Sequence, residues 1–394
     1  MSKWVKILIL LGVFAVYAIL RLSFIPIELN NRAIILGVGI DFDGEKDMYK
    51  LSAEIITPKT SGSGSETGAQ AGGQKIVKGE GVSVSLAVRD LYNCFGKTPS
   101  FGECCIVLIG EDCAKRKSLK DVLDYFFASS AFRDGTVVAI CNGEAEKMLT
   151  RKSQIDDYVS FALQTLLVDS DGKAQIDYTT FNYVAQSFFN KSNGCYVNYV
   201  EFLPQKDEET AQTATPDSSS VSSEQGKFYT GQAVLFRDGN YVGKLNRQEL
   251  DGLNLGGGKN VFCTFTDVTR PSGRSLGVIK KKGGMDVAIE EEKIVVSLNL
   301  TLTVSELLTD TTGEVLPLQA KQSEKLNYMQ KQGAKRQAEE AVLAAYQKAV
   351  DLDCDIWEIK NELYARYGKE IEKVVESENF WQNVTFLVDI ECIG

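Results

Sequence analysis

The pattern of apolar and polar positions first sets apart one long apolar segment at the amino terminus. Apolar residues run without interruption from Ile7 to Leu20, between Lys6 and Arg21. This run is short for a membrane span, which needs about 20 residues. Apolar neighbours extend it on both sides, and the flanking cations can reach the interfaces. We therefore predict a membrane anchor over residues 1–24, with its amino terminus in the cytoplasm because more cations precede the run than follow it.

The alternative for this segment is a cleaved signal peptide. Val16 to Ala18 would then be the small-residue cleavage site. Tyr17 and the hydrophobicity that continues after Ala18 argue against cleavage and favour an uncleaved anchor. Both interpretations leave the rest of the chain outside the membrane.

Strand-like and helix-like patterns alternate in the first half of the remaining chain, residues 28–203. Asp43-Gly44 supplies the turn between the first two strands. Ser83 or Ser85 is expected to cap the first helix, and Ser118 the second. The pattern predicts strands over 32–42, 49–58, 104–110 and 136–143, and helices over 83–95 and 118–132 and from 144.

The second half, residues 228–394, has the same mixed character. Two strands flank the turn at 238–240, and a hairpin is predicted with its tip at 290–293. A long helix is predicted over 324–350, and alternation over 380–394 indicates a terminal strand. The fold class is therefore α+β, with mixed sheets flanked by helices.

Two stretches of small polar residues divide this pattern. Residues 60–74 have no apolar periodicity and are interpreted as a flexible hairpin loop. Residues 204–227 are longer and too polar to collapse, so they are interpreted as a disordered linker between two domains, 28–203 and 228–394.

Composition excludes several classes of function. The chain has 394 residues, a net charge of −10 and no histidine. The acidic balance argues against nucleic acid as a partner. The lack of histidine removes Ser–His and Cys–His nucleophile pairs, His-ligated zinc and the usual general base near neutral pH. We therefore predict that the protein is not an enzyme and that it has no cofactor.

The nine cysteines are scattered, and none forms a C-x-x-C pair. Most have apolar neighbours, where a cysteine behaves as a small buried hydrophobe. The odd count leaves at least one thiol unpaired within the chain. We predict mostly reduced core thiols, with one or two disulfides as the alternative.

The segment 30–45, with Gly37 and Gly39 followed by acidic residues, raises the question of a phosphate or calcium site. A dinucleotide site needs a third glycine and a following helix, and a calcium loop needs more oxygen ligands and a terminal glutamate. The segment lacks the features that either kind of site requires. The preferred interpretation is that these glycines lie in a strand against which a neighbouring element packs closely.

Three other segments carry weaker signals. Residues 252–259 lack a complete phosphate-loop motif and are interpreted as a flexible bend, and 290–293 as a solvated hairpin tip. The carboxylates of 351–357 could gather cations weakly but are interpreted as surface groups. We therefore predict no catalytic, cofactor-binding or metal-binding residues.

The order of segments resembles the Ger(x)C family, the C subunits of spore nutrient-germinant receptors. "AIILGVGID", "AEIITP", "GEGVSVSLAVRDL" and "ECCIVLIGEDCAK" follow one another as in that family, and "FLVDIECIG" is similar to its last strand. Positions in the second half that resemble the family's pattern of Ala, Phe, Gly, Leu, Glu and Gly, in this order, are Ala233, Phe236, Gly243, Leu245, Glu249 and Gly252.

This resemblance implies an elongated, multi-lobed α+β protein on the outer face of the spore inner membrane. It implies a non-enzymatic receptor subunit that acts with membrane-embedded A and B subunits in the response to nutrients. Typical members carry a lipobox cysteine before the first strand, whereas Ser23 lies near that position here and no cysteine precedes Cys94. Diacylation is therefore excluded, and attachment to the lipid bilayer would depend on the amino-terminal helix.

Two alternatives come from other functional classes. One is a membrane-anchored extracytoplasmic protein that binds envelope polysaccharide. The other is a carboxylate-based hydrolase, which needs two acidic side chains facing each other at roughly 5 to 9.5 Å across a cleft. The sequence gives no sign of such a pair.

Overall fold

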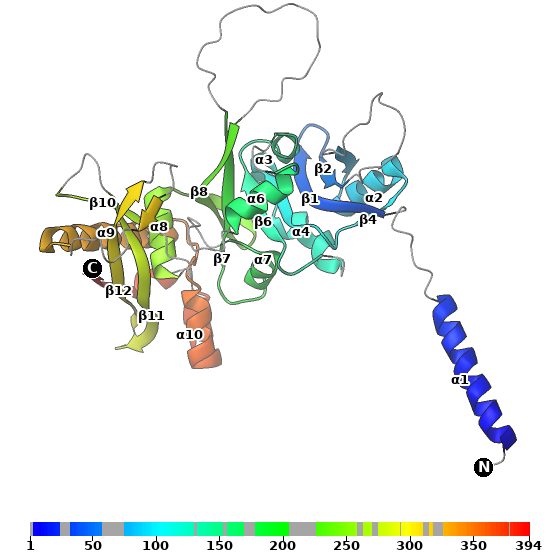
Figure 1. Ribbon diagram of the computed structural model, residues 1–394. Coiled ribbons are helices and arrows are strands. Elements are labelled where there is room, and N and C mark those ends of the chain that lie inside the picture. Colours follow the sequence, from blue (N-terminus) through cyan, green and yellow to red (C-terminus); the bar gives the residue numbers. More distant parts are fainter. Residues whose placement is uncertain are drawn as a thin grey trace, which may run out of the picture.

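The computed structural model contains two mixed sheets, each covered by helices, and a separate amino-terminal helix (Figure 1). The predicted loop 60–74 and most of the predicted linker 204–227 lie outside the described residues. The described residues are 3–23, 32–56, 75–129, 132–152, 156–168, 178–204, 226–257, 263–269, 275–291, 293–309, 315–317, 326–377 and 379–394.

The amino-terminal helix α1 (Lys3–Ser23) forms over the predicted anchor segment. Several of its apolar side chains are exposed, with Leu10 at 73% and Phe14 at 68%. Within the part of the chain that the structure describes, no helix combines the length and apolarity required to cross a membrane.

The first sheet has a parallel centre and antiparallel margins. Its order is β3-β2-β1-β5-β6-β7-β8-β9, with β4 parallel to the beginning of β1. The predicted hairpin around residues 43–47 is confirmed as the β1–β2 pair. The strands are β1 (Arg32–Asp43), β2 (Met48–Ile55), β3 (Lys75–Gly81), β4 (Thr98–Ser100), β5 (Ile106–Gly110), β6 (Val137–Cys141), β7 (Gly194–Pro204), β8 (Gly226–Arg237) and β9 (Asn240–Leu245).

Helices cover both faces of this sheet. On β5, Val107 and Ile109 join the core under α2, α4 and α7, whereas Ile106 and Leu108 join the core under α5 and α6. Burial on both faces explains the continuous apolar run of this strand. The helices are α2 (Val84–Phe95), α3 (Glu111–Arg116), α4 (Leu119–Ala128), α5 (Ala145–Leu149), α6 (Val159–Leu167) and α7 (Phe181–Ser187).

The second sheet has the order β10-β11-β12-β13, and β14 runs parallel to β12. The predicted hairpin is confirmed: β11 and β12 pair up to Glu290 and Lys293, with Glu291 at φ 47°. Its elements are β10 (Thr264–Thr266), β11 (Ser275–Glu290), β12 (Lys293–Thr309), β13 (Val315–Pro317), β14 (Val384–Ile393), α8 (Arg247–Gly256), α9 (Tyr328–Asp351), α10 (Ile359–Tyr367), α11 (Glu372–Val375) and the 3₁₀ turns Gly368–Ile371 and Phe380–Asn383.

Helix α9 lies against this sheet. Ala334, Ala338 and Val342 pack on apolar residues of β12, including Leu298 and Leu300. The helix starts at Tyr328, four residues later than predicted, because a capping box at Asn327 and Gln330 satisfies its first N–H groups.

The caps predicted for two earlier helices are confirmed. Ser83 Oγ accepts from the backbone N–H of Leu86, and Ser118 Oγ from that of Lys120. Both side chains satisfy a donor that the first turn leaves without an intrahelical partner.

The predicted linker does not separate two independent sheets. β7 and β8, on either side of residues 205–225, pair antiparallel from Gly194↔Arg237 to Pro204↔Gly226. β8 and β9 thus extend the first sheet, although they come from the second half of the chain. Strand pairing depends on hydrogen bonds between the flanks of the predicted linker, which composition does not report.

Candidate functional site

The glycine pair singled out in the sequence allows close packing on β1. A Cβ at Gly37 would overlap Ser160 Oγ of α6. A Cβ at Gly39 would lie 2.5 Å from Ser52 Oγ and 3.1 Å from the Cβ of Ala145. Close approach of neighbouring elements, the interpretation preferred from sequence, is confirmed.

The acidic residues that follow these glycines are engaged by the protein itself. Asp43 Oδ2 forms an ion pair with Lys50 Nζ at 2.9 Å. The carboxylate of Asp41 accepts hydrogen bonds from the backbone N–H groups of Ala145 and Glu146 at 2.8 and 2.9 Å. Asp41 therefore holds the first turn of α5 against β1.

Glu54 on β2 does the same for α6. Its two carboxylate oxygens accept from the backbone N–H groups of Val159 and Ser160 at 3.0 and 2.8 Å. The positive end of each helix favours a carboxylate at this place. Burial nevertheless raises the pKa of Asp41 to about 6 against the opposing effect of its hydrogen bonds. Both carboxylates thus fix helices to the sheet.

The acidic segment 351–357 is not the surface cluster that its composition suggested. Asp355 is fully buried, and its carboxylate accepts from the backbone N–H groups of Ile359 and Lys360 at 2.9 and 2.8 Å. Burial raises the pKa of Asp355. The Asp355 side chain thus binds the first backbone N–H groups of α10, as Asp41 does for α5.

The same segment joins the two halves of the protein. Ser192 Oγ donates to the carbonyl oxygen of Asp355 at 2.9 Å, and Asn193 Nδ2 donates to that of Asp353 at 3.0 Å. Trp381 Nε1 donates to Asp353 Oδ1 at 2.8 Å. Asp353 and Asp355, which composition assigned to the surface, are therefore part of the junction between the sheets, whereas Asp351 is exposed as expected.

A second polar network lies between α3, β7 and β9. Glu111 accepts from the Tyr199 hydroxyl at 2.6 Å and pairs with Lys115 and Lys244 at 2.8 and 2.9 Å. Burial alone would raise the pKa of Glu111, but these three hydrogen bonds outweigh it and hold the pKa at about 2. The network is a structural tie, because every oxygen of this carboxylate has a protein partner.

The glycine-rich segment 252–259 is helical where the structure describes it, not a flexible bend. Gly252 lies in α8, where an added Cβ would overlap the carbonyl oxygen of Ala341. A Cβ at Gly256 would lie 2.6 Å from the indole of Trp357. These glycines allow α8 to approach α9 and the segment before α10.

The nine cysteines are free, which confirms the prediction of reduced thiols. Eight are buried, and Cys94 is exposed. Burial raises the pKa of Cys113 and of Cys195 to about 12, so neither thiol is a ready nucleophile.

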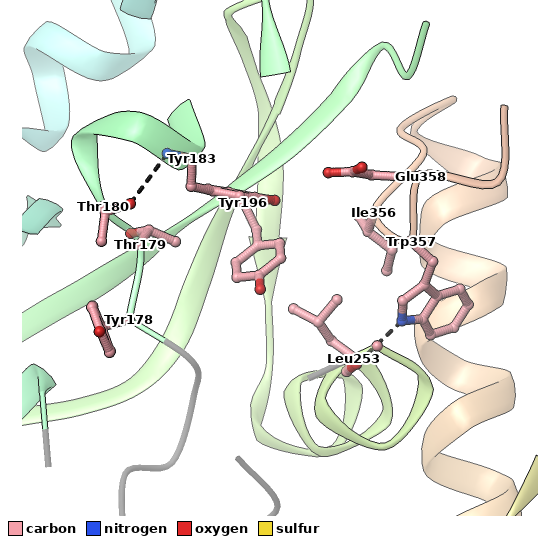
Figure 2. Close-up of a pocket in the computed structure, with 10 residues that line it drawn as sticks. Tyr178, Thr179, Thr180, Tyr183, Tyr196, Leu253, Ile356, Trp357 and Glu358 are labelled. Atoms are coloured by element: carbon pink, nitrogen blue, oxygen red, sulfur yellow. Dashed lines mark hydrogen bonds between the residues drawn. The ribbon is translucent and has the colours of Figure 1, made fainter. Parts of the chain in front are cut away.

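A hollow of about 610 Å³ lies between the two halves (Figure 2). In Figure 2, Glu358 directs its carboxylate from the loop before α10 toward Tyr183 and Tyr196. The rings of these tyrosines lie 5.2 Å apart, centre to centre. Burial raises the pKa of Tyr183 well above its ordinary value, so its phenol stays neutral. The lining residues are Tyr178, Thr179, Thr180, Tyr183, Tyr196, Leu253, Gly257, Ile356, Trp357 and Glu358.

Trp357 is fixed at the edge of this hollow. Its Nε1 donates to the carbonyl oxygen of Leu253 at 3.2 Å, and its ring stacks on Phe386 with centroids 5.6 Å apart. Sequence reasoning did not single out Tyr183, Tyr196 or Glu358, because nothing in their local patterns shows that distant segments meet there.

The structure adds no metal centre to this hollow. Among the described residues, no group of three or more His, Cys, Asp and Glu side chains is arranged to hold a metal ion. The polar and aromatic chemistry that lines this hollow consists of aromatic rings, hydroxyl groups and the carboxylate of Glu358.

Comparisons with known proteins cover almost the whole chain. Residues 26–202 match the family described as "Spore germination protein N-terminal domain", and residues 230–392 match "Spore germination B3/GerAC like, C-terminal". The crystal structure of the GerBC protein is similar in fold, with a TM-score of 0.50, 15% sequence identity and coverage of 91% of this chain and 97% of that one. No curated protein matches.

Proposed function

Because this chain belongs to the Ger(x)C family of spore germination proteins, we propose that it is a subunit of a membrane-bound germinant receptor complex, needed for the germination response to nutrients. The observation that carries the proposal is the match of both halves of the chain to the two domains of this family. The family is one of non-enzymatic receptor subunits.

The geometry supports a binding and assembly role. Buried carboxylates that could otherwise suggest acid–base chemistry, Asp41, Glu54 and Asp355, each accept hydrogen bonds from the start of a helix. A non-enzymatic subunit needs a rigid surface held at high effective concentration beside its partners. The proposed partners are the membrane-embedded A and B subunits, and co-purification from spore membranes tests this part.

The experiment that tests the role uses spores that lack only this chain. Release of dipicolinic acid is followed after addition of nutrients and, separately, after a trigger that bypasses receptors. Loss of the nutrient response with a normal bypass response supports the proposal. A normal nutrient response contradicts it and would favour the alternative, a membrane-anchored protein that binds envelope polysaccharide.

The proposed location is the spore inner membrane, with the bulk of the chain on the extracytoplasmic face. Support comes from α1, whose exposed apolar side chains include Leu10 and Phe14, because an apolar helix gains free energy when lipid covers it. We expect the double substitution Leu10→Asp and Phe14→Asp to release the protein from membranes, since a charged group in the bilayer is costly.

The matched control for this location is Leu343→Asp on α9, an exposed leucine of the folded part. This variant should stay in the membrane fraction. A mature chain that begins after Ala18 would contradict the uncleaved anchor, and retention of the doubly substituted chain would contradict attachment through α1.

A further inference from the structure

Glu358 occupies the position where a helix-capping side chain is expected, yet it does not cap α10. It is the N-cap residue, but its side chain accepts no capping hydrogen bond from the backbone N–H groups of the first turn. The first N–H groups of α10, those of Ile359 and Lys360, are bound by Asp355 instead. The carboxylate of Glu358 is therefore available to the hollow.

The backbone of Glu358 also departs from what a glutamate prefers. Its φ is 57° and its ψ 34°, in the left-handed region that favours glycine. Residues held in such conformations cluster at ligand-binding sites, where the surrounding structure determines them. Here the conformation sends the side chain away from the helix axis and toward α7 (Figure 2).

The charge of Glu358 has no cationic partner in the described part of the chain. Its contact there is with the Nδ2 group of Asn361 at 3.5 Å. The two lysines near this loop are engaged elsewhere: Lys191 pairs with Glu372 and Glu376, and Lys360 pairs with Asp353. A partly buried carboxylate without a cationic partner favours a ligand that carries a positive charge.

A second hollow, of about 500 Å³, lies on the other side of Glu358 along α7. It is lined in part by Asn190, whose Oδ1 atom is buried and accepts no hydrogen bond within the described residues. A buried acceptor without a donor costs free energy. The Asn190 acceptor is enclosed by protein, whereas Glu358 borders both hollows and is the acceptor that a ligand can approach.

The first hollow supplies surfaces for the remainder of such a ligand. Tyr183 and Tyr196 offer aromatic rings, which attract cations through their faces, and Leu253 and Ile356 are apolar. A space of about 610 Å³ is within the usual range for a small-molecule site. Trp357 is already held by Leu253 and Phe386, so one wall is preformed.

From these observations we infer that the hollow between the two halves is a binding site for a small organic cation, an ammonium or guanidinium group on an apolar body, with Glu358 as its anchor. The cation lies against Glu358, and the body lies against Tyr183 and Tyr196. This inference does not depend on the receptor role, because binding is measured on the isolated protein.

The test is calorimetric titration of the full chain in detergent with phenethylammonium. The probes for comparison are 2-phenylethanol, which lacks the charge, phenylacetate, which reverses it, and agmatine, which carries a guanidinium group. We expect phenethylammonium to bind at least about tenfold more tightly than 2-phenylethanol and phenylacetate not to bind. Failure of both cations to bind, or equal binding of the alcohol, overturns the inference.

Two variants of Glu358 and one control variant test whether Glu358 binds the cation. Glu358→Gln should weaken phenethylammonium binding at least about tenfold. Glu358→Gly should abolish the charge-dependent binding and raise the unfolding temperature, because glycine accepts the left-handed backbone without strain. Glu362→Gln on the same helix, where Glu362 pairs with Arg366, should change the affinity less than twofold. Unchanged affinity in both Glu358 variants would falsify the anchor role.

Discussion

The Tyr199 hydroxyl donates a hydrogen bond of 2.6 Å to Glu111 Oε2 and so joins the centre of the first sheet to α3. Lys115 and Lys244 bind the other carboxylate oxygen. The Glu111 side chain is only 15% exposed, so these three groups supply most of the stabilisation of its charge. The pH dependence of stability follows from this arrangement.

Glu111→Gln should destabilise the fold at pH 7. The folded pKa of Glu111, about 2, lies below its ordinary 4.5, so its contribution is present above about pH 4.5 and is lost as pH falls toward 2. At pH 7 the variant should have a free energy of unfolding up to about 3 kcal/mol below that of the wild type. At pH 3 this difference should be smaller. Urea unfolding at both pH values measures it.

The control for this change is Glu103→Gln. Glu103 pairs with Arg133 on the surface, where both side chains are more than half exposed, and such pairs contribute about 0–1 kcal/mol. If Glu103→Gln lowered the free energy of unfolding as much as Glu111→Gln, burial of the Glu111 network would not explain its contribution to stability.

Asp41→Asn should have the opposite pH dependence. Burial raises the folded pKa of Asp41 from 3.8 to about 6, so protonation favours the fold below about pH 4 and this contribution is lost as pH rises through 6. Between pH 4 and 7 the wild type should therefore lose up to about 3 kcal/mol relative to the variant.

Asp43→Asn is the matched comparison, two residues along the same strand. The hydrogen bond from Lys50 lowers the pKa of Asp43, so its contribution is lost as pH falls. Denaturant unfolding across this pH range should show slopes of opposite sign for the two variants, and equal slopes would contradict the burial argument for Asp41.

Gly37→Ala should destabilise the protein by about 1–3 kcal/mol, the usual cost of overpacking a core. The added Cβ would overlap Ser160 Oγ, which lies in the buried interface of β1 and α6. Gly284→Ala is the control, because a Cβ there meets no atom within 4 Å. Thermal unfolding compares the two, and a neutral Gly37→Ala would contradict close packing at this strand.

Cys94 should react with a thiol reagent far faster than the other eight cysteines. It is exposed and they are buried, and burial raises the pKa of thiols such as Cys104 and Cys354. Ellman's reagent should titrate about one thiol in the native protein and all nine after unfolding. Cys94→Ser should remove the fast phase, and its persistence in that variant would contradict the assignment.

Local patterns were sufficient for most elements. Ser83 and Ser118 cap the helices predicted from their spacing, and the turn after Asp43 joins two strands as expected. These features depend on residues within a few positions of one another. Local hydrogen bonds and side-chain periodicity determine them, whatever the rest of the chain does.

The features that failed or were missed depend on long-range contacts. Residues 252–256 form part of α8, because Gly252 allows the helix to approach Ala341. In the acidic segment 351–357, Asp355 is buried rather than exposed, since the Ser192–Gly194 segment, far away in sequence, packs against it. Composition cannot show which distant backbone groups a carboxylate will meet.

The sequence by itself determined the α+β class, the positions of most strands and of the longest helices, the family and the close packing around Gly37 and Gly39. Only the tertiary structure decided that β8 and β9 complete the first sheet and that Asp41, Glu54 and Asp355 each hold a helix. It also decided that Glu358 faces Tyr183 and Tyr196 between the halves. The reason is physical: periodicity is a local property of the chain, whereas sheet order and a shared hollow require segments far apart in sequence to meet, as do the contacts of Asp41 and Glu54 with helices more than 100 residues away.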